Sequence, residues 1–172
     1  MIRYHPRMTI VEALLPEFDR EMGLTRRLLE RVPEAHFDWK PHARSMTLGR
    51  LAEHLAQLPE WAALTLTQDG TEMGPSAPEH VATTRSAVLA MFDLNVAKAR
   101  SALHGRTDAE LMAPWTLTSQ GKELFTMPKA SVLRTFVLNH LVHHRGQLTV
   151  YLRLHDIALP SIYGPSGDET SR

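Results

Sequence analysis

Apolar residues recur at three- and four-residue intervals in four stretches of the chain, the spacing of an α-helix with one buried face. The first two predicted helices cover about 9–31 and 47–66, and the next two cover 79–104 and about 128–155. Thr9, with Glu12 three residues later, has the spacing of a capping box at the start of the first helix. The pattern therefore predicts an all-α fold.

Two connections between these helices are long. Residues 68–78 are rich in Gly, Pro, Ser and Thr, which favours a crossover loop. Residues 107–129 lack helical spacing, and their two short runs about Gln120-Gly121 indicate a small β-hairpin or an irregular lid. We expect residues 1–172 to form one domain, a single antiparallel four-helix bundle with long crossover loops.

The last predicted helix carries the pattern most relevant to function. On a helical wheel with about 100° per residue, one set of its side chains falls within roughly 60° of a single, buried direction. The opposite face, with Arg134, Arg145 and Arg153, is expected to face water. The buried set contains Phe136, Val137, His140, His144, Gln147, Leu148, Tyr151 and His155.

His140 and His144 therefore lie one turn apart in the middle of an apolar stripe. They are either neutral core histidines with hydrogen-bonded partners or ligands of a divalent metal. A buried imidazole needs partners for both nitrogens, and a metal satisfies one nitrogen of each ring at once. His54, between Leu51 and Leu58 on the second predicted helix, also faces inward.

The amino-acid composition excludes several classes of partner and of metal ligand. The 19 basic and 19 acidic residues cancel, which argues against nucleic-acid and anionic-membrane partners. The absence of cysteine excludes thiolate ligands, so a metal would be held by nitrogen and oxygen. We see neither a membrane-spanning run nor a signal-peptide core, and we expect a cytoplasmic protein.

His54, His140 and His144 on facing helices would leave a coordination position open, as in catalytic metal sites. This ligand set admits zinc, nickel, iron or manganese. His155 lies three turns beyond His144, roughly 16 Å by helical rise, which is too far to bind the same ion. His143 is about 80° from the stripe axis, which places it beside the site or at the pocket rim.

Two stretches of the chain resemble the DinB/YfiT-like family of metal-dependent enzymes. The family's C-terminal helix and tail are similar to NHLVHHRGQLTVYLRLHDIALPSIYGPSGDE, and its second helix is similar to DWKPHARSMTLGRLAEHLAQLPEW. The resemblance implies a four-helix bundle with a three-histidine metal site, here His54, His140 and His144. It also implies a low-molecular-weight thiol as second cofactor, and among the admitted ions we expect zinc or nickel.

The sequence indicates less directly which reaction a metal site of this kind would catalyse. No H-E-x-x-H arrangement is present, so no glutamate is built in as general base. The resemblance implies thiol S-transfer, and a hydrolase is the other enzymatic interpretation; His143 and Arg145 are the candidate assisting residues. The alternative is a non-catalytic, stress-associated metal- or ligand-binding protein. We expect a small-molecule substrate and a homodimer.

In the C-terminal tail, Tyr163 and Asp168 either line a pocket or pin the last helix, and we favour pinning.

Overall fold

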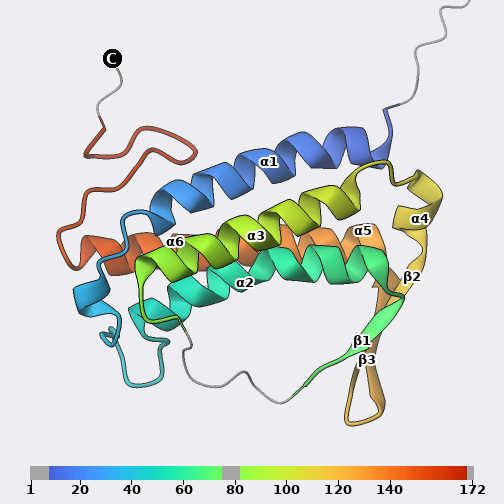
Figure 1. Cartoon of the computed structure of the whole chain (residues 1–172), viewed down its shortest axis with the longest axis horizontal. Helices are drawn as coiled ribbons and strands as arrows, with labels where there is room; N and C mark the ends of the chain where they lie inside the picture. Colours follow the sequence, from blue (N-terminus) through green and yellow to red (C-terminus); the bar gives the residue numbers. More distant parts are fainter. Residues whose placement is uncertain (1–7, 75–81, 170–172) are drawn as a thin grey trace, which may run out of the picture.

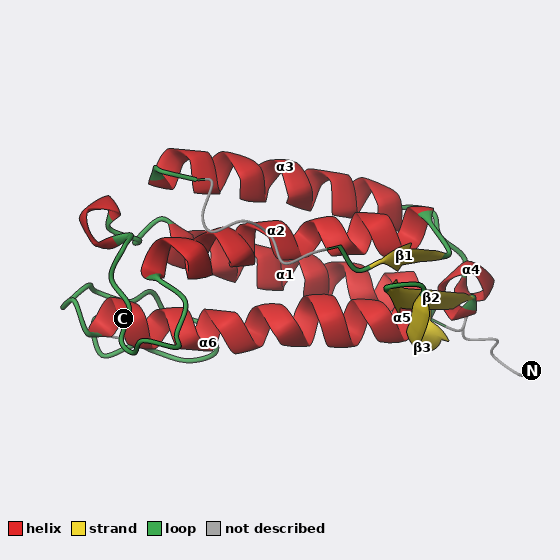
Figure 2. Cartoon of the chain, turned by 90° about the horizontal axis from the view of Figure 1, so that it is seen from below, coloured by secondary structure: helices red, strands yellow, loops and turns green. Residues whose placement is uncertain are grey.

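The computed structural model describes residues 8–74 and 82–169, and these residues form a mostly helical structure with one small sheet (Figures 1 and 2). The mostly helical character predicted from the sequence is confirmed. Three long helices lie beside a fourth helical segment at the C-terminal end of the chain. The three are α1 (Ile10–Leu29), α2 (Leu48–Thr67) and α3 (Arg85–Leu103).

The fourth segment is continuous but changes its winding. It consists of α5 (Lys129–Val132), the π-helical stretch η2 (Leu133–Asn139) and α6 (His140–Arg153). A π-helical stretch inserted in an α-helix shifts the direction of the side chains on either side of it, and such insertions are frequent at functional sites. Here the shift comes immediately before His140.

Threonine side chains cap the N-termini of α1, α2, α3 and one short helix. Each accepts a hydrogen bond from a backbone N–H in the first turn, which satisfies a donor that has no partner within the helix. The predicted capping box of Thr9 and Glu12 is present. The caps of α1, α2, α3 and the short helix α4 (Asp108–Met112) are Thr9, Thr47, Thr84 and Thr107.

Two boundaries differ from the sequence prediction. Residues 107–129 were expected to lack helix, but Thr107 and Glu110 form a second capping box that begins α4. The predicted start of the third helix, at residues 79–81, lies outside the described residues. Within them α3 begins only at Arg85, because Thr84 caps it.

The apolar faces of the long helices meet in one core. Its fully buried members come from every long element, for example Leu28 of α1, Leu55 of α2, Phe92 of α3 and Val137 of η2. A buried amide adds a polar link, since Asn95 donates to the Ala56 carbonyl at 3.0 Å. Side chains that face between α2 and the last helical segment are therefore held by a packed core on both elements.

A three-stranded sheet lies at one end of the helices (Figures 1 and 2). The predicted hairpin is confirmed: β2 (Pro114–Ser119) pairs antiparallel with β3 (Lys122–Pro128). Its turn uses Gln120 and Gly121, both with positive φ (51° and 72°), as a tight hairpin turn requires.

The first strand, β1 (Gly70–Glu72), pairs in parallel with β2 and was missed, because its sequence was interpreted as loop. Three residues are too few to show alternation. Glycine is needed at position 70, since a Cβ there would lie 2.4 Å from the Thr116 carbonyl oxygen. Through β1, the end of α2 is tied to the hairpin that precedes α5.

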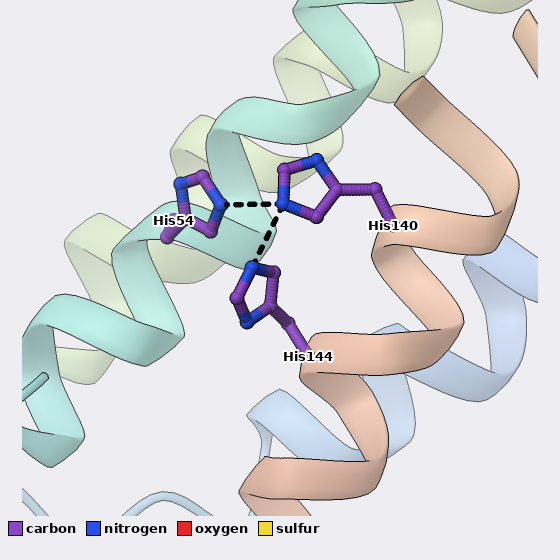
Figure 3. A group of neighbouring side chains, drawn as sticks. All are labelled: His54, His140 and His144. Atoms are coloured by element: carbon purple, nitrogen blue, oxygen red, sulfur yellow. Dashed lines mark hydrogen bonds between the residues drawn. The ribbon is translucent and has the colours of Figure 1, made fainter. Parts of the chain in front are cut away.

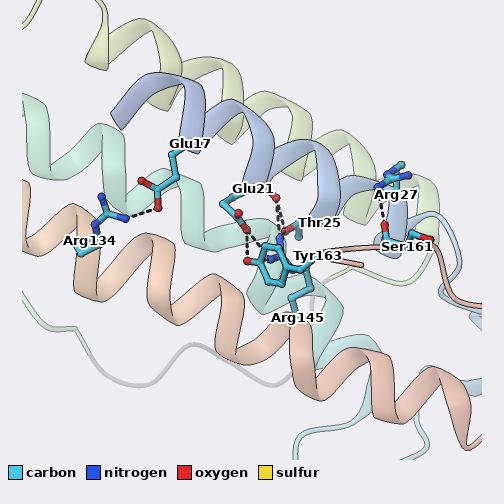
Figure 4. Close-up of polar contacts among 8 residues, drawn as sticks. All are labelled: Glu17, Glu21, Thr25, Arg27, Arg134, Arg145, Ser161 and Tyr163. Carbon is cyan, nitrogen blue, oxygen red and sulfur yellow. Dashed lines mark hydrogen bonds and ion pairs between the residues drawn. The ribbon is translucent and has the colours of Figure 1, made fainter. Parts of the chain in front are cut away.

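The C-terminal tail folds back on α1 and α6 (Figure 4). Tyr163 donates to Glu21 at 2.7 Å, and Arg27 donates to the Ser161 carbonyl at 2.8 Å. Asp168 accepts from Arg153 at 2.5 Å, and this ion pair, with a backbone N–H bond, lowers the pKa of Asp168 to about 2. The tail therefore pins the last helix, as favoured from the sequence.

None of the helices within residues 8–74 and 82–169 has both the length and the apolar character that spanning a bilayer requires.

Candidate metal centre

Three histidine rings from two helices converge at one point (Figure 3). His54 comes from α2, and His140 and His144 come from α6. The Nε2 atoms of His54 and His140 are 3.3 Å apart, and those of His140 and His144 are 2.8 Å apart. The structure thus brings together the three residues that the sequence analysis selected.

Local structure explains the convergence. His140 and His144 are four residues apart on a regular α-helix, so their side chains leave the same face one turn apart. His54 faces them from α2, between the buried Leu51 and Leu58. The rings are in edge contact, with centroids 4.6 Å apart for His54 and His144.

The second nitrogen of two rings is already occupied. His144 Nδ1 lies 2.7 Å from the Gln147 side-chain oxygen, so it carries a proton and donates it. The ring of His140 donates to the backbone carbonyl of Phe136. Such outward hydrogen bonds fix the tautomer that leaves the other nitrogen free to bind a metal.

Burial keeps all three rings neutral. Desolvation, followed by the neighbouring His144 and His140, lowers the pKa of His54 to about 4. Desolvation also lowers the pKa of His140 and of His144, and the hydrogen bonds to Phe136 and Gln147 oppose that shift. Neutral imidazole is the form that binds a metal.

The donor set fits a transition metal. In neutral form His140 and His144 point lone pairs at each other across 2.8 Å, and His54 has one Nε2 proton at most to share. At least one nitrogen is then left without a donor from this cluster, and a single cation among the three satisfies them all. Nitrogens around a tetrahedral zinc ion are about 3.3 Å apart, and the ligand atoms here all lie within 4.8 Å of one another.

An apolar cavity of about 300 Å³ adjoins the cluster, and His54 and His140 form part of its wall. Other walls come from the sheet and from the last helical segment, where Trp115, Phe125 and Phe136 pack in a row. Trp115 is completely buried, and its ring N–H has no acceptor among the described residues. The three-histidine site therefore opens on a cavity with aromatic walls.

The two candidate assisting residues, His143 and Arg145, are in different environments. His143 is exposed and its ring touches that of His144, with centroids 4.8 Å apart, so it sits beside the site as expected. Arg145 was expected to face water, and that prediction is wrong: it is 1% exposed and bonds Glu21, Thr25 and Tyr163. A buried arginine needs a partner, and its partner is 124 residues away in sequence.

Two features of the site were missed from the sequence. Gln147 was placed on the buried face and given no role; it is exposed, but its spacing of three from His144 lets the two side chains meet at the edge of the site. The Phe136 carbonyl has no sequence signal. The cavity was also missed, because it needs the sheet to lie against the helices.

Fold and cluster together define a class: mostly helical proteins in which three histidines from two helices could hold a metal ion. Within that class, the family model described as the DinB family matches residues 8–171. The chain belongs to the DinB family, which confirms the resemblance noted in the sequence.

Individual relatives agree with this assignment. The chain is 27% identical over 169 residues to the uncharacterized protein YrdA of Bacillus subtilis (strain 168), covering 94% of this chain and 93% of that one. A DinB-like protein from Bacillus cereus ATCC 10987 matches in structure with a TM-score of 0.70 at 23% identity, covering 91% of this chain and 99% of the other. The DinB-like protein YjoA of Bacillus subtilis gives 0.66 at 18% identity, covering 89% and 99%. At these identities the two solved structures support the fold.

Proposed function

We propose that this protein is a metal-dependent enzyme in which His54, His140 and His144 hold one divalent transition metal, zinc or nickel, with a coordination position open to a substrate. The observation that carries the proposal is the convergence of the three Nε2 atoms while the second nitrogens of His140 and His144 are held by other groups. The proposal takes the four long helical segments as one antiparallel four-helix bundle, with the site between two of them.

A bound metal would supply Lewis acidity, which lowers the pKa of a thiol or water molecule at the open position. The residues of the chain supply the setting. Gln147 and the Phe136 carbonyl orient the rings of His144 and His140. The apolar cavity keeps water away from the nucleophile, which strengthens the electrostatic interactions within the site.

We favour thiol S-transfer over hydrolysis. The cluster of possible ligands in the described residues contains three histidines and no carboxylate, so no carboxylate general base is built into it. A thiolate needs no further base at neutral pH, whereas water does. In this reaction the thiolate sulfur bonds to an electrophilic carbon of a small molecule, whose leaving group departs with the bonding electron pair.

His143 is the residue of this chain placed to move a proton at the site edge. Its ring is exposed to solvent and contacts the ring of His144. Arg145 takes no part in the proposal, since its guanidinium is held on the α1 side of the helix by Glu21. The homodimer and the cytoplasmic location stay predictions from the sequence.

The test is a conjugation assay on zinc- or nickel-loaded protein with a small thiol and a chromogenic aryl halide. We expect acceleration that needs the metal and is lost in His54→Ala, while His104→Ala, which changes a histidine at the exposed end of α3, keeps it. Protein that holds one metal ion but accelerates neither conjugation nor ester hydrolysis would contradict the enzyme proposal and support a non-catalytic metal-binding protein.

A further inference from the structure

The cavity beside the three histidines is bounded by three parts of the fold. Trp61 comes from α2, Leu117 and Phe125 come from the β2–β3 hairpin, and Phe136 comes from η2. His54 and His140 border the same space, so a molecule in the cavity lies against two of the three proposed metal ligands. The hairpin is therefore a wall of the site as well as an appendage of the helices.

The wall of the cavity is almost entirely apolar. Its residues, apart from the two neutral histidines, are apolar, and four of them are aromatic. Phe125 and Phe136 stack with ring centroids 4.8 Å apart and planes 5° from parallel, and Trp61 meets Trp115 edge-on at 6.5 Å. A charged or strongly hydrated group would lose its hydration here without gaining a charged partner, whereas an aromatic ring would find rings to pack against.

The size of the cavity limits its occupant. About 300 Å³ is at the lower end of small-molecule sites. A cavity of about 150 Å³ accepts benzene, so this one accommodates a one- or two-ring aromatic group and is too small for a folded partner. A larger depression of about 480 Å³ lies between the start of α1 and α5, but Arg134 lines it and the three histidines do not.

We propose that the cavity is the specificity pocket of the enzyme and that it binds an aryl group of the electrophilic substrate. The electrophilic carbon then lies beside the open metal position, with the aryl group held by Trp61, Phe125 and Phe136. This inference rests on the proposed function for the identity of the site, and it adds the class of substrate. The hairpin, through Leu117 and Phe125, sets which ring systems fit.

The first experiment measures binding to Co²⁺-loaded protein, with the thiolate-to-cobalt absorption band as readout. Benzyl mercaptan and 2-mercaptoethanol are the probes, because they are thiols of similar acidity that differ in carrying a phenyl or a hydroxyl group. We expect benzyl mercaptan to bind at least about tenfold more tightly, since only its ring gains from burial in the apolar cavity.

Two variants change the cavity and one is the matched control. Leu117→Trp fills it and should remove the preference for the phenyl group. Phe125→Ala removes one aromatic wall and should reduce the preference at least about threefold. Leu124→Ala changes the neighbouring side chain on β3, which is 52% exposed and lies outside the cavity, and it should keep the preference. Cobalt stoichiometry is measured on each, so that a folding defect is recognised.

The second experiment separates this inference from the proposed function. Naphthalene is added to metal-free protein, and equilibrium dialysis measures its binding to the cavity. Binding that Leu117→Trp blocks supports the aromatic pocket even if no metal is held, an outcome that would overturn the proposed function alone. Equal affinity for the two thiols at full cobalt occupancy, or no naphthalene binding, overturns the inference.

Discussion

His144 and Arg145 are neighbours on α6, yet they belong to two polar clusters of opposite kinds (Figures 3 and 4). Arg145 points to α1, where Glu21, Thr25 and Tyr163 supply it with acceptors. His144 points towards α2, and its ring faces those of His54 on α2 and His140 on α6. One cluster satisfies its hydrogen-bonding groups internally, and the other leaves nitrogen lone pairs directed at a common point.

This difference indicates that the Arg145 cluster is structural and that the histidine cluster is a binding site. The Arg145 cluster links α1, α6 and the tail and leaves no position for a ligand, so its role is to hold these three parts together. The histidine cluster borders a cavity and gains its missing partner only from outside the chain. Two buried polar clusters of similar size can therefore be told apart by counting donors and acceptors.

The largest effect on stability is expected for Arg145→Ala. It leaves the carboxylate of Glu21 buried without its cation, which costs about 3–5 kcal/mol of unfolding free energy for a buried pair. Urea unfolding measures the loss. Arg134→Ala, which removes the exposed pair with Glu17, is the control and should cost about 1 kcal/mol or less. A similar loss in both variants would contradict a special role for the Arg145 cluster.

Replacing both charged residues should recover most of the unfolding free energy that Arg145→Ala loses. In the double variant Arg145→Met, Glu21→Leu no unpaired charge remains buried, and such replacements of buried pairs are often neutral or stabilising. We expect the double variant to unfold within about 2 kcal/mol of the wild type, while its metal content is unchanged. If it were as unstable as Arg145→Ala, the pair itself, and not the orphaned charge, would be the source of the stability.

On the histidine side, Gln147→Ala should weaken metal binding by about 10- to 100-fold, the usual effect of removing the group that orients a ligating imidazole. Competition with a chromophoric chelator measures the affinity. Asn139→Ala changes an exposed residue just before His140 and should leave the affinity unchanged. Unaltered affinity in Gln147→Ala would mean that the bond from His144 does not orient the ring for a metal.

A further effect is a pH dependence of the metal-free protein. Burial lowers the pKa of His54 to about 4 from its ordinary 6.5, so between these values the unfolded chain binds a proton that the folded chain does not. Stability therefore falls as the pH is lowered from 6.5 to 4. His54→Asn should flatten that part of the stability profile in urea unfolding between pH 7 and 4. An unchanged slope would show that His54 is not the group responsible.

Much of this picture could be predicted from local patterns. The helical period located α1, α2 and the last helical segment, and the spacing of His140 and His144 placed them on one face, because these signals lie within a few residues. The turn at Gln120 and Gly121 was likewise visible.

What escaped prediction depends on partners far apart in the chain. Arg145 is buried only because Glu21 is brought to it, and β1 is a strand only because β2 pairs with it. The wheel placed Phe136 on the face of His140, and both line the cavity, but the π-helical stretch has no local signal and the cavity needs the hairpin to close it.

The central claim, that the three histidines hold a metal, is tested most directly by elemental analysis of the untagged protein beside the His140→Ala, His144→Ala double variant. The account predicts about one equivalent of a transition metal per chain in the wild type and none in the variant, with both proteins folded. Wild-type protein that holds no metal after exposure to zinc, nickel or manganese would contradict it and leave three core histidines.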